Sequence, residues 1–153
     1  MTNTKKKLAE KIETNGVQIY ESSDHRLVFG KGDCLCTVIF CYDIVTCDVS
    51  KAIIRDEPGP DEFRKINDLI NETRFGKHSL KYNPKKRKFD YIFSVEFSSK
   101  NYLVYETIQY ALRAFIRAYD IMVCPDIKTA YQMIAKYQDV IASAPKRRGE
   151  RRE

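Results

Sequence analysis

The sequence lacks the segments and motifs by which membrane proteins, secreted proteins and several large enzyme classes are recognised. No apolar run approaches the ~20 residues of a membrane-spanning helix. The N-terminus, "MTNTKKKLAEKIETNG", is charged and has no apolar core, so it is not a secretory signal. There is no G-x-x-x-x-G-K-[ST] loop, no G-x-G-x-x-G and no H-E-x-x-H. These absences predict a globular protein of the cytoplasm that does not contact membranes.

Histidine is also scarce, which limits the chemistry that cysteine can perform. The 153 residues include only His25 and His78, and they fall on different predicted strands. A catalytic thiol needs a neighbouring base, and nothing in the sequence brings either histidine to a cysteine. We therefore predict no enzymatic activity, no catalytic residue and no cofactor, and a thiol- or histidine-dependent enzyme is the weakest of the hypotheses considered.

Cysteine, by contrast, is concentrated in one place. Four of the five cysteines lie in "GDCLCTVIFCYDIVTCDVS", residues 32–50. A zinc ion needs four ligands that converge to ~2.3 Å from one point. The spacing C-x-C-x₄-C-x₅-C puts the first three cysteines on one strand, with Cys34 and Cys36 on one face and Cys41 on the other. We therefore predict no metal site.

Two registers of the following hairpin are considered for these cysteines. If the turn centres on Ile44, Cys41 lies opposite Cys47; if the register shifts by one residue, Cys47 joins the face of the first two cysteines and lies opposite Phe40. Neither register gathers four thiols. The favoured interpretation is core packing by reduced thiols. A Cys41–Cys47 disulfide stays open as an alternative for an oxidised protein.

The periodicity of apolar residues predicts an α+β fold. Period-two patterns indicate an antiparallel meander of three or four strands between 17 and 54 and a hairpin over 78–97. Helical patterns cover 5–14, 60–75, about 101–119 and 127–137. The second strand of the hairpin is the clearest, because its aromatic and aliphatic residues share one face: Phe89, Tyr91, Phe93, Val95 and Phe97. We expect a single domain over 1–143, with helices on one face of the sheet, and a flexible basic tail over 144–153.

The strand from Cys34 to Tyr42 is apolar on both faces, so both faces need cover. The domain's helices can cover one of them. The other is covered either by a second copy or a bound partner segment, or by the first or last helix wrapping around the sheet. On the first alternative, the last helix and this strand are the contact surfaces, with the strand's contact residues predicted to be Val38, Phe40 and Tyr42.

The formal net charge of +6 is unevenly distributed. The last eight residues, "KRRGERRE", hold five basic and two acidic side chains, and "KKRK" fills a predicted turn at 85–88. Solvated turns and frayed termini account for such runs of basic residues. The runs also allow an alternative function, because basic patches bind phosphate backbones electrostatically. The predicted nucleic-acid contacts on that alternative are Lys85, Lys86, Arg87, Lys88, Arg147 and Arg148.

One stretch carries a family resemblance. It runs from "IIRDEPGPDEFRKINDLINETRFGKHSLKY" into "KFDYIFSVEF", with Ile66, Asn67, Leu69, Ile70 and Asn71 on a Pro-marked helix before Phe75-Gly76. In this pattern, and in the order helix, three strands, helix, two strands, helix, residues 5–135 resemble the YbjN-like proteins, which share the fold of type III secretion chaperones. The resemblance implies an α+β sandwich, frequent dimerisation and a non-catalytic role in binding or regulation. The first hypothesis is therefore a homodimeric, chaperone-like or regulatory module that binds a protein or peptide.

Overall fold

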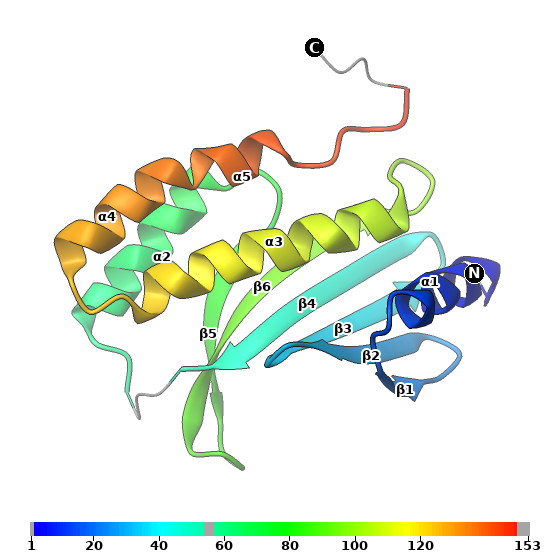
Figure 1. The fold of residues 1–153 in the computed structure, drawn as a ribbon, viewed down its shortest axis with the longest axis horizontal. Coiled ribbons are helices and arrows are strands. Elements are labelled where there is room, and N and C mark those ends of the chain that lie inside the picture. The colour runs from blue at the N-terminus through cyan, green and yellow to red at the C-terminus, as the bar shows by residue number, and fades with distance from the viewer. Residues whose placement is uncertain (1, 54–56, 150–153) are drawn as a thin grey trace.

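The structure is a computed structural model that describes residues 2–53 and 57–149 (Figure 1). Its elements, in chain order, are α1 (Thr2–Thr14), β1 (Ile19–Ser22), β2 (Arg26–Lys31), β3 (Cys34–Cys41), β4 (Ile44–Ala52), α2 (Pro60–Glu72), β5 (Lys77–Asn83), β6 (Lys88–Ser98), α3 (Val104–Val123), α4 (Ile127–Lys136) and α5 (Gln138–Ala142). Among the helices of this part of the chain, none combines the length and the apolar character that crossing a bilayer requires.

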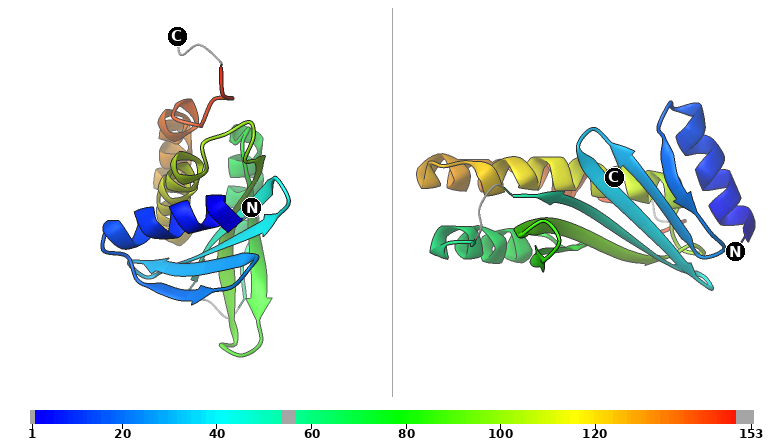
Figure 2. Two further views of the ribbon diagram at one scale, coloured as in Figure 1. Left: turned by 90° about the vertical axis from the view of Figure 1, so that its right-hand side faces the viewer. Right: turned by 90° about the horizontal axis from the view of Figure 1, so that it is seen from below.

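The strands form one antiparallel sheet in the order β1-β2-β3-β4-β6-β5. The meander β1–β4 and the hairpin β5–β6 meet where β4 pairs with β6, from Ile44 opposite Ser98 to Ala52 opposite Asp90. The helices gather on one face of this sheet (Figures 1 and 2). The predicted α+β class, a meander plus a hairpin with helices on one face, is confirmed.

Helix α3 is the centre of the helical layer and contacts β4, β6 and the other four helices. Its apolar stripe packs on the aromatic face of β6, as the alternation of that strand predicts. The ring of Phe115 stacks on Tyr91 with centroids 5.4 Å apart, and Tyr110 meets Phe93 edge-on at 6.2 Å. All four rings are fully buried. Each such side chain contributes roughly 1.5–3 kcal/mol through burial, so this α3–β6 contact is the main stabilising layer of the domain.

A buried lysine ties α2 to the C-terminal end of α3. Lys65 is 3 % exposed, and its Nζ donates to the backbone oxygens of Cys124 at 2.7 Å and Met122 at 3.3 Å. These carbonyls belong to the last turn of α3, where the helix itself supplies no donor and the dipole favours a cation. Lys65 therefore caps the C-terminal end of α3, just before Pro125 and the turn into α4.

The β3–β4 hairpin differs from both registers considered above. Its loop is the two-residue turn Tyr42-Asp43, with Tyr42 at φ 54°, so that Cys41 pairs with Ile44. Two-residue hairpin loops require positive φ because only then does the turn match the twist of the strands. The observed pairing is shifted by two residues from the second register, so the prediction that Cys47 shares the face of Cys34 and Cys36 is confirmed, although Cys47 lies opposite Val38 and not Phe40. It is shifted by three residues from the first register, and an odd shift moves Cys47 to the face opposite Cys41.

In the observed register Cys47 lies opposite Val38, on the helix-covered face, whereas Cys41 is on the other face and exposed. The alternative of a Cys41–Cys47 bridge is therefore wrong, since the two side chains point to opposite sides of the sheet. Cys36 and Cys47 are both fully buried, with sulfurs 3.5 Å apart. Core packing is confirmed for these two thiols and is wrong for Cys41.

Candidate functional site

Two of the three contact residues predicted on β3 lie in the interior. Val38 is 0 % and Phe40 2 % exposed, because their side of β3 faces the helical layer. They belong to the domain's own core, so their assignment as partner contacts is corrected. Tyr42, which is 83 % exposed, remains at the surface, at the tip of the hairpin.

The other face of β3 is the one left open. Leu35 and Ile39 on β3 and Ile44 on β4 are each about two-fifths exposed, at 43 %, 40 % and 39 %. Within residues 2–53 and 57–149 no helix packs on this face (Figure 2). The alternative in which the first or last helix wraps around the sheet is therefore wrong for the described part of the chain.

The two basic segments do not form one surface. Residues 85–87 lie in the turn between β5 and β6, where Arg87 has φ 52°, Lys88 is the first residue of β6, and all four cations are exposed. Arg147 and Arg148 are also exposed, on the segment that follows α5. Figure 1 shows the turn and this segment at opposite ends of the molecule. A nucleic acid would therefore meet them as two separate patches.

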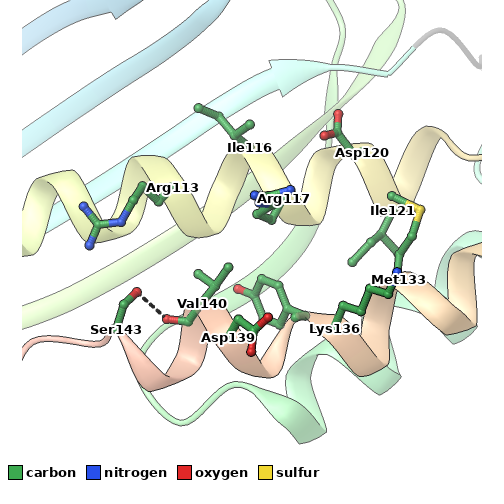
Figure 3. A pocket seen from close by; sticks show the side chains of 11 residues that line it. Arg113, Ile116, Arg117, Asp120, Ile121, Met133, Lys136, Asp139, Val140 and Ser143 are labelled. Carbon is green, nitrogen blue, oxygen red and sulfur yellow. Dashed lines mark hydrogen bonds between the residues drawn. The ribbon is translucent and has the colours of Figure 1, made fainter.

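A large concavity lies in the helical layer, between α3 and the α4–α5 pair (Figure 3). We call it the α3/α5 groove; its volume is about 780 Å³. It is lined by Arg113, Ile116, Arg117, Asp120, Ile121, Met133, Lys136, Tyr137, Asp139, Val140 and Ser143. The α3 members recur at intervals of three and four residues, so they form one face of that helix.

The groove has an apolar floor and charged rims. Ile121 and Tyr137 are buried at its base, beside the half-buried Met133 and Val140. Arg113 and Arg117 follow one another along α3, one turn apart, and Lys136, Asp139 and Ser143 line the α4–α5 side (Figure 3). A site with an apolar base and a few polar groups at its edge is the usual arrangement of a ligand-binding pocket.

A buried hydrogen-bond network fixes the wall of this groove. Tyr137, at the junction of α4 and α5, places its hydroxyl 3.5 Å from Nε2 of His78 on β5. The same nitrogen lies 2.9 Å from the hydroxyl of Thr73, and Nδ1 contacts the hydroxyl of Tyr91. Both ring nitrogens of His78 are thus used, and the network ties the end of α2, the sheet and α4–α5 together.

Burial explains the electrostatics of this network. Desolvation lowers the pKa of His78 to about 3, so the imidazole is neutral, and burial raises the pKa of Tyr91 and Tyr137 above the ordinary value. Among residues 2–53 and 57–149, the hydrogen-bond partners of His78 are hydroxyl groups and not sulfurs. The arrangement has the properties of a structural core network, in which low dielectric strengthens hydrogen bonds between neutral groups.

Sequence reasoning missed both the groove and the His78 network. Arg113 and Arg117 fall off the apolar stripe of α3 and are indistinguishable in sequence from an ordinary solvated face. His78 stands at an inward position of an alternating strand, which is the one local sign that it is buried. Within the described ranges, no three His, Cys, Asp or Glu side chains are grouped closely enough to hold a metal ion.

Comparison with known proteins assigns this chain to no family. No protein-family model matches the sequence, and no functionally curated protein is significantly similar to it. Among solved structures, the chain is similar to the crystal structure of YbjN from E. coli, which is described as a candidate transcription regulator. The superposition covers 89 % of this chain and 87 % of that chain, at 8 % sequence identity and a TM-score of 0.43. This likeness concerns the overall course of the chain and says nothing about what the protein binds.

Proposed function

We propose that this protein is a non-enzymatic, cytoplasmic module that binds a segment of another protein, and that the α3/α5 groove is the binding site. The observation that carries the proposal is the groove itself, because it joins an apolar floor to exposed charged side chains. A regulatory or chaperone-like role needs a surface of this kind and no catalytic group.

The dimensions of the groove suit a peptide. Along α3 it extends from Arg113 to Ile121, which is ~12 Å or about two helical turns at 1.5 Å per residue. Its volume of about 780 Å³ lies in the range of pockets that enclose drug-sized ligands. It can therefore take several side chains of a short helix or extended segment, as grooves between helices do in other complexes.

Site-specific photocrosslinking tests the proposal. A photoreactive phenylalanine derivative replaces Lys136 or Ser143 in the groove, or Ile39 or Ser79 away from it; all four positions are exposed. We expect a discrete crosslinked protein partner from the groove positions, competed away by unlabelled protein. Crosslinking from Ile39 alone would place the binding site on the open sheet face. The absence of a crosslinked partner from all four positions would contradict the proposal.

We also propose that the protein dimerises, with the open face around Leu35, Ile39 and Ile44 as the contact. Exposed aliphatic side chains on an uncovered sheet face support this, since a second copy can cover them by two-fold symmetry. Light scattering on the wild type and on Ile39→Asp tests it. A dimer that becomes a monomer on this substitution supports the proposal, and a wild-type monomer at micromolar concentration removes it.

Nucleic-acid binding remains the second candidate function. One observation favours it: residues 85–88 present four exposed cations, none of which forms an ion pair with a described residue. Retention on mixed DNA or RNA that falls steeply with salt would support it. Because the turn and residues 146–148 lie at opposite ends of the molecule (Figure 1), the variants Lys85→Glu/Lys86→Glu and a truncation of 145–153 show separately which patch is used.

A further inference from the structure

We infer that the α3/α5 groove selects an acidic amphipathic segment of its partner, with carboxylates paired to Arg113 and Arg117 and apolar side chains on the groove floor. The inference rests on the proposed function and adds the chemistry of the ligand. It is carried by the charges of the groove, their missing partners and the apolar base beneath them.

The cations of the groove have no ion-pair partners within the described residues. Arg113, Arg117 and Lys136 are all exposed, and no carboxylate lies within 4.0 Å of their charged groups. The acidic lining residues are fewer. Asp120 on α3 and Asp139 on α5 are the two carboxylates of the lining, against three cations. The lining therefore carries a net formal charge of +1.

Arg113 and Arg117 repel one another along α3, and the helix offers a nearby carboxylate, Asp120 at i+3, only to Arg117. Arg113 and Arg117 are four residues apart, the spacing at which like charges destabilise a helix by roughly 0.2–0.5 kcal/mol. The helix offers Arg113 no carboxylate in compensation, because positions 109, 110 and 116 are Gln, Tyr and Ile. An incoming carboxylate beside both guanidinium groups removes this repulsion, so it gains more than a single surface ion pair would give.

The segment after α5 extends the positive surface. Its backbone crosses from Ser143, at one end of the groove, to the loop before α3, where the amide of Arg148 donates to the oxygen of Asn101 at 2.7 Å. Lys146 and Arg147 lie on this crossing and are exposed. Both residues lie within four positions of Ser143 in the chain, so the Cα atom of each is at most ~14 Å from the Cα atom of Ser143. The end of the groove near Arg113 is therefore the more basic one.

The floor distinguishes a protein segment from a nucleic acid. A phosphate backbone needs cations and leaves an apolar floor unused. The half-buried Met133 and Val140 instead offer a surface that only apolar side chains fill with a gain in free energy. Two arginines four residues apart are ~6 Å apart along α3, so they match two carboxylates at the same spacing on a partner helix.

The test begins with a randomised library of helical 18-residue peptides displayed on phage. Selection is carried out against the wild type, against Arg113→Glu/Arg117→Glu, and against Lys85→Glu/Lys86→Glu, which makes the same change of net charge on the distant turn. We expect peptides from the wild type and the turn variant to be enriched in Asp and Glu four residues apart, flanked by apolar residues. The groove variant should select Lys and Arg instead, which also shows that it folds.

A selected peptide is then synthesised with Glu or with Gln at the acidic positions, and its binding is measured by fluorescence anisotropy. The Gln form should bind about tenfold more weakly, the effect of losing two partly exposed ion pairs, and the difference should shrink in high salt. Amide shift changes in NMR spectra locate the peptide and should cluster on α3, α4 and α5.

The remaining outcomes separate the inference from the proposed function. Groove binding by peptides without acidic enrichment would overturn the charge inference and leave the proposed function standing. Shift changes away from the groove, or selection of no peptide at all, would overturn both. Displacement of the peptide by a single-stranded oligonucleotide that binds tighter, and that loses this binding in Arg113→Glu/Arg117→Glu, would assign the groove to nucleic acid and overturn the inference.

Discussion

Acidification should unfold this protein through His78, which the fold holds neutral in its core. The imidazole is 3 % exposed, and both of its nitrogens are used by hydroxyl groups. Burial lowers the pKa of His78 in the folded protein to about 3, whereas an exposed histidine titrates near pH 6.5. Between these two values the unfolded chain binds a proton that the folded protein excludes. The free energy of unfolding therefore decreases as the pH falls through this window.

The size of the effect follows from the two pKa values. Linkage predicts a loss of about 2 kcal/mol between pH 8 and pH 5 and about 4 kcal/mol by pH 3. Single domains have free energies of unfolding of only 5–15 kcal/mol, so the loss at pH 5 is a substantial part of the total.

Urea denaturation at pH 8, 6.5, 5 and 4 measures the loss directly. The variant His78→Gln keeps an amide donor and an acceptor but does not titrate. We expect it to be less stable than the wild type at pH 8 and to lose about 2 kcal/mol less between pH 8 and pH 5. His25→Gln removes the exposed histidine instead and should keep the full decline of the wild type.

Equal declines in the wild type and in His78→Gln would refute this reasoning, because they would assign the acid sensitivity to other groups. So would an NMR titration in which the ring of His78 takes up its proton between pH 6 and 7 while the protein is still folded.

Three further predictions concern stability and reactivity. Gly76→Ala should destabilise the protein by more than about 2 kcal/mol in urea denaturation, because Gly76 has φ 122° and an added Cβ would lie 2.6 Å from a ring carbon of Phe93. The control Gly32→Ala, at φ 62° with open space around the added Cβ, should cost only about 1 kcal/mol. Equal costs for the two variants would contradict the steric argument. Lys65→Met should cost about 2 kcal/mol by leaving two carbonyl oxygens at the end of α3 without their charged donor, and an unchanged denaturation midpoint would show that the lysine is dispensable. In the native protein a thiol reagent should modify the exposed Cys41 quickly and the buried Cys36 only at the rate of unfolding, since the hydrogen bond with the Cys47 thiol and burial raise the pKa of Cys36. Fast reaction of both thiols would contradict the register of the β3–β4 hairpin.

Local patterns determine much of this fold, and these parts could be predicted. The alternation of β6 identifies its buried face because every second residue from Phe89 to Phe97 is large and apolar. The helical stripe of α3 likewise identifies the helix that covers the sheet. The choice of which face of β3 is buried could not be made in this way, because both faces of that strand are apolar. It depends on a two-residue turn at Tyr42, a residue that seldom adopts positive φ.

The α3/α5 groove was beyond sequence reasoning for a different physical reason. Its shape depends on how far α4 and α5 stand from α3, and that distance is set by tertiary contacts, including the bend at Tyr137 where α4 ends and α5 begins. The polar face of α3 has the same sequence pattern whether or not a second helix rises beside it. The α4–α5 side of the groove could not be predicted either. Helix α5 has five residues, which is too short for a 3.6-residue periodicity to be recognised in the sequence.

The pairing of β4 with β6 has a consequence for how the chain reaches its native state. It joins positions 54 residues apart at one end and 38 at the other, whereas β3 and β4 turn back on each other at once. The meander and the β5–β6 hairpin can each form early from neighbouring residues, but their docking has to wait for a long loop to close around α2. Until then each half exposes the strand edge that later becomes the middle of the sheet. Folding intermediates that wait for this docking step are thus also the species most prone to aggregate with other newly made copies.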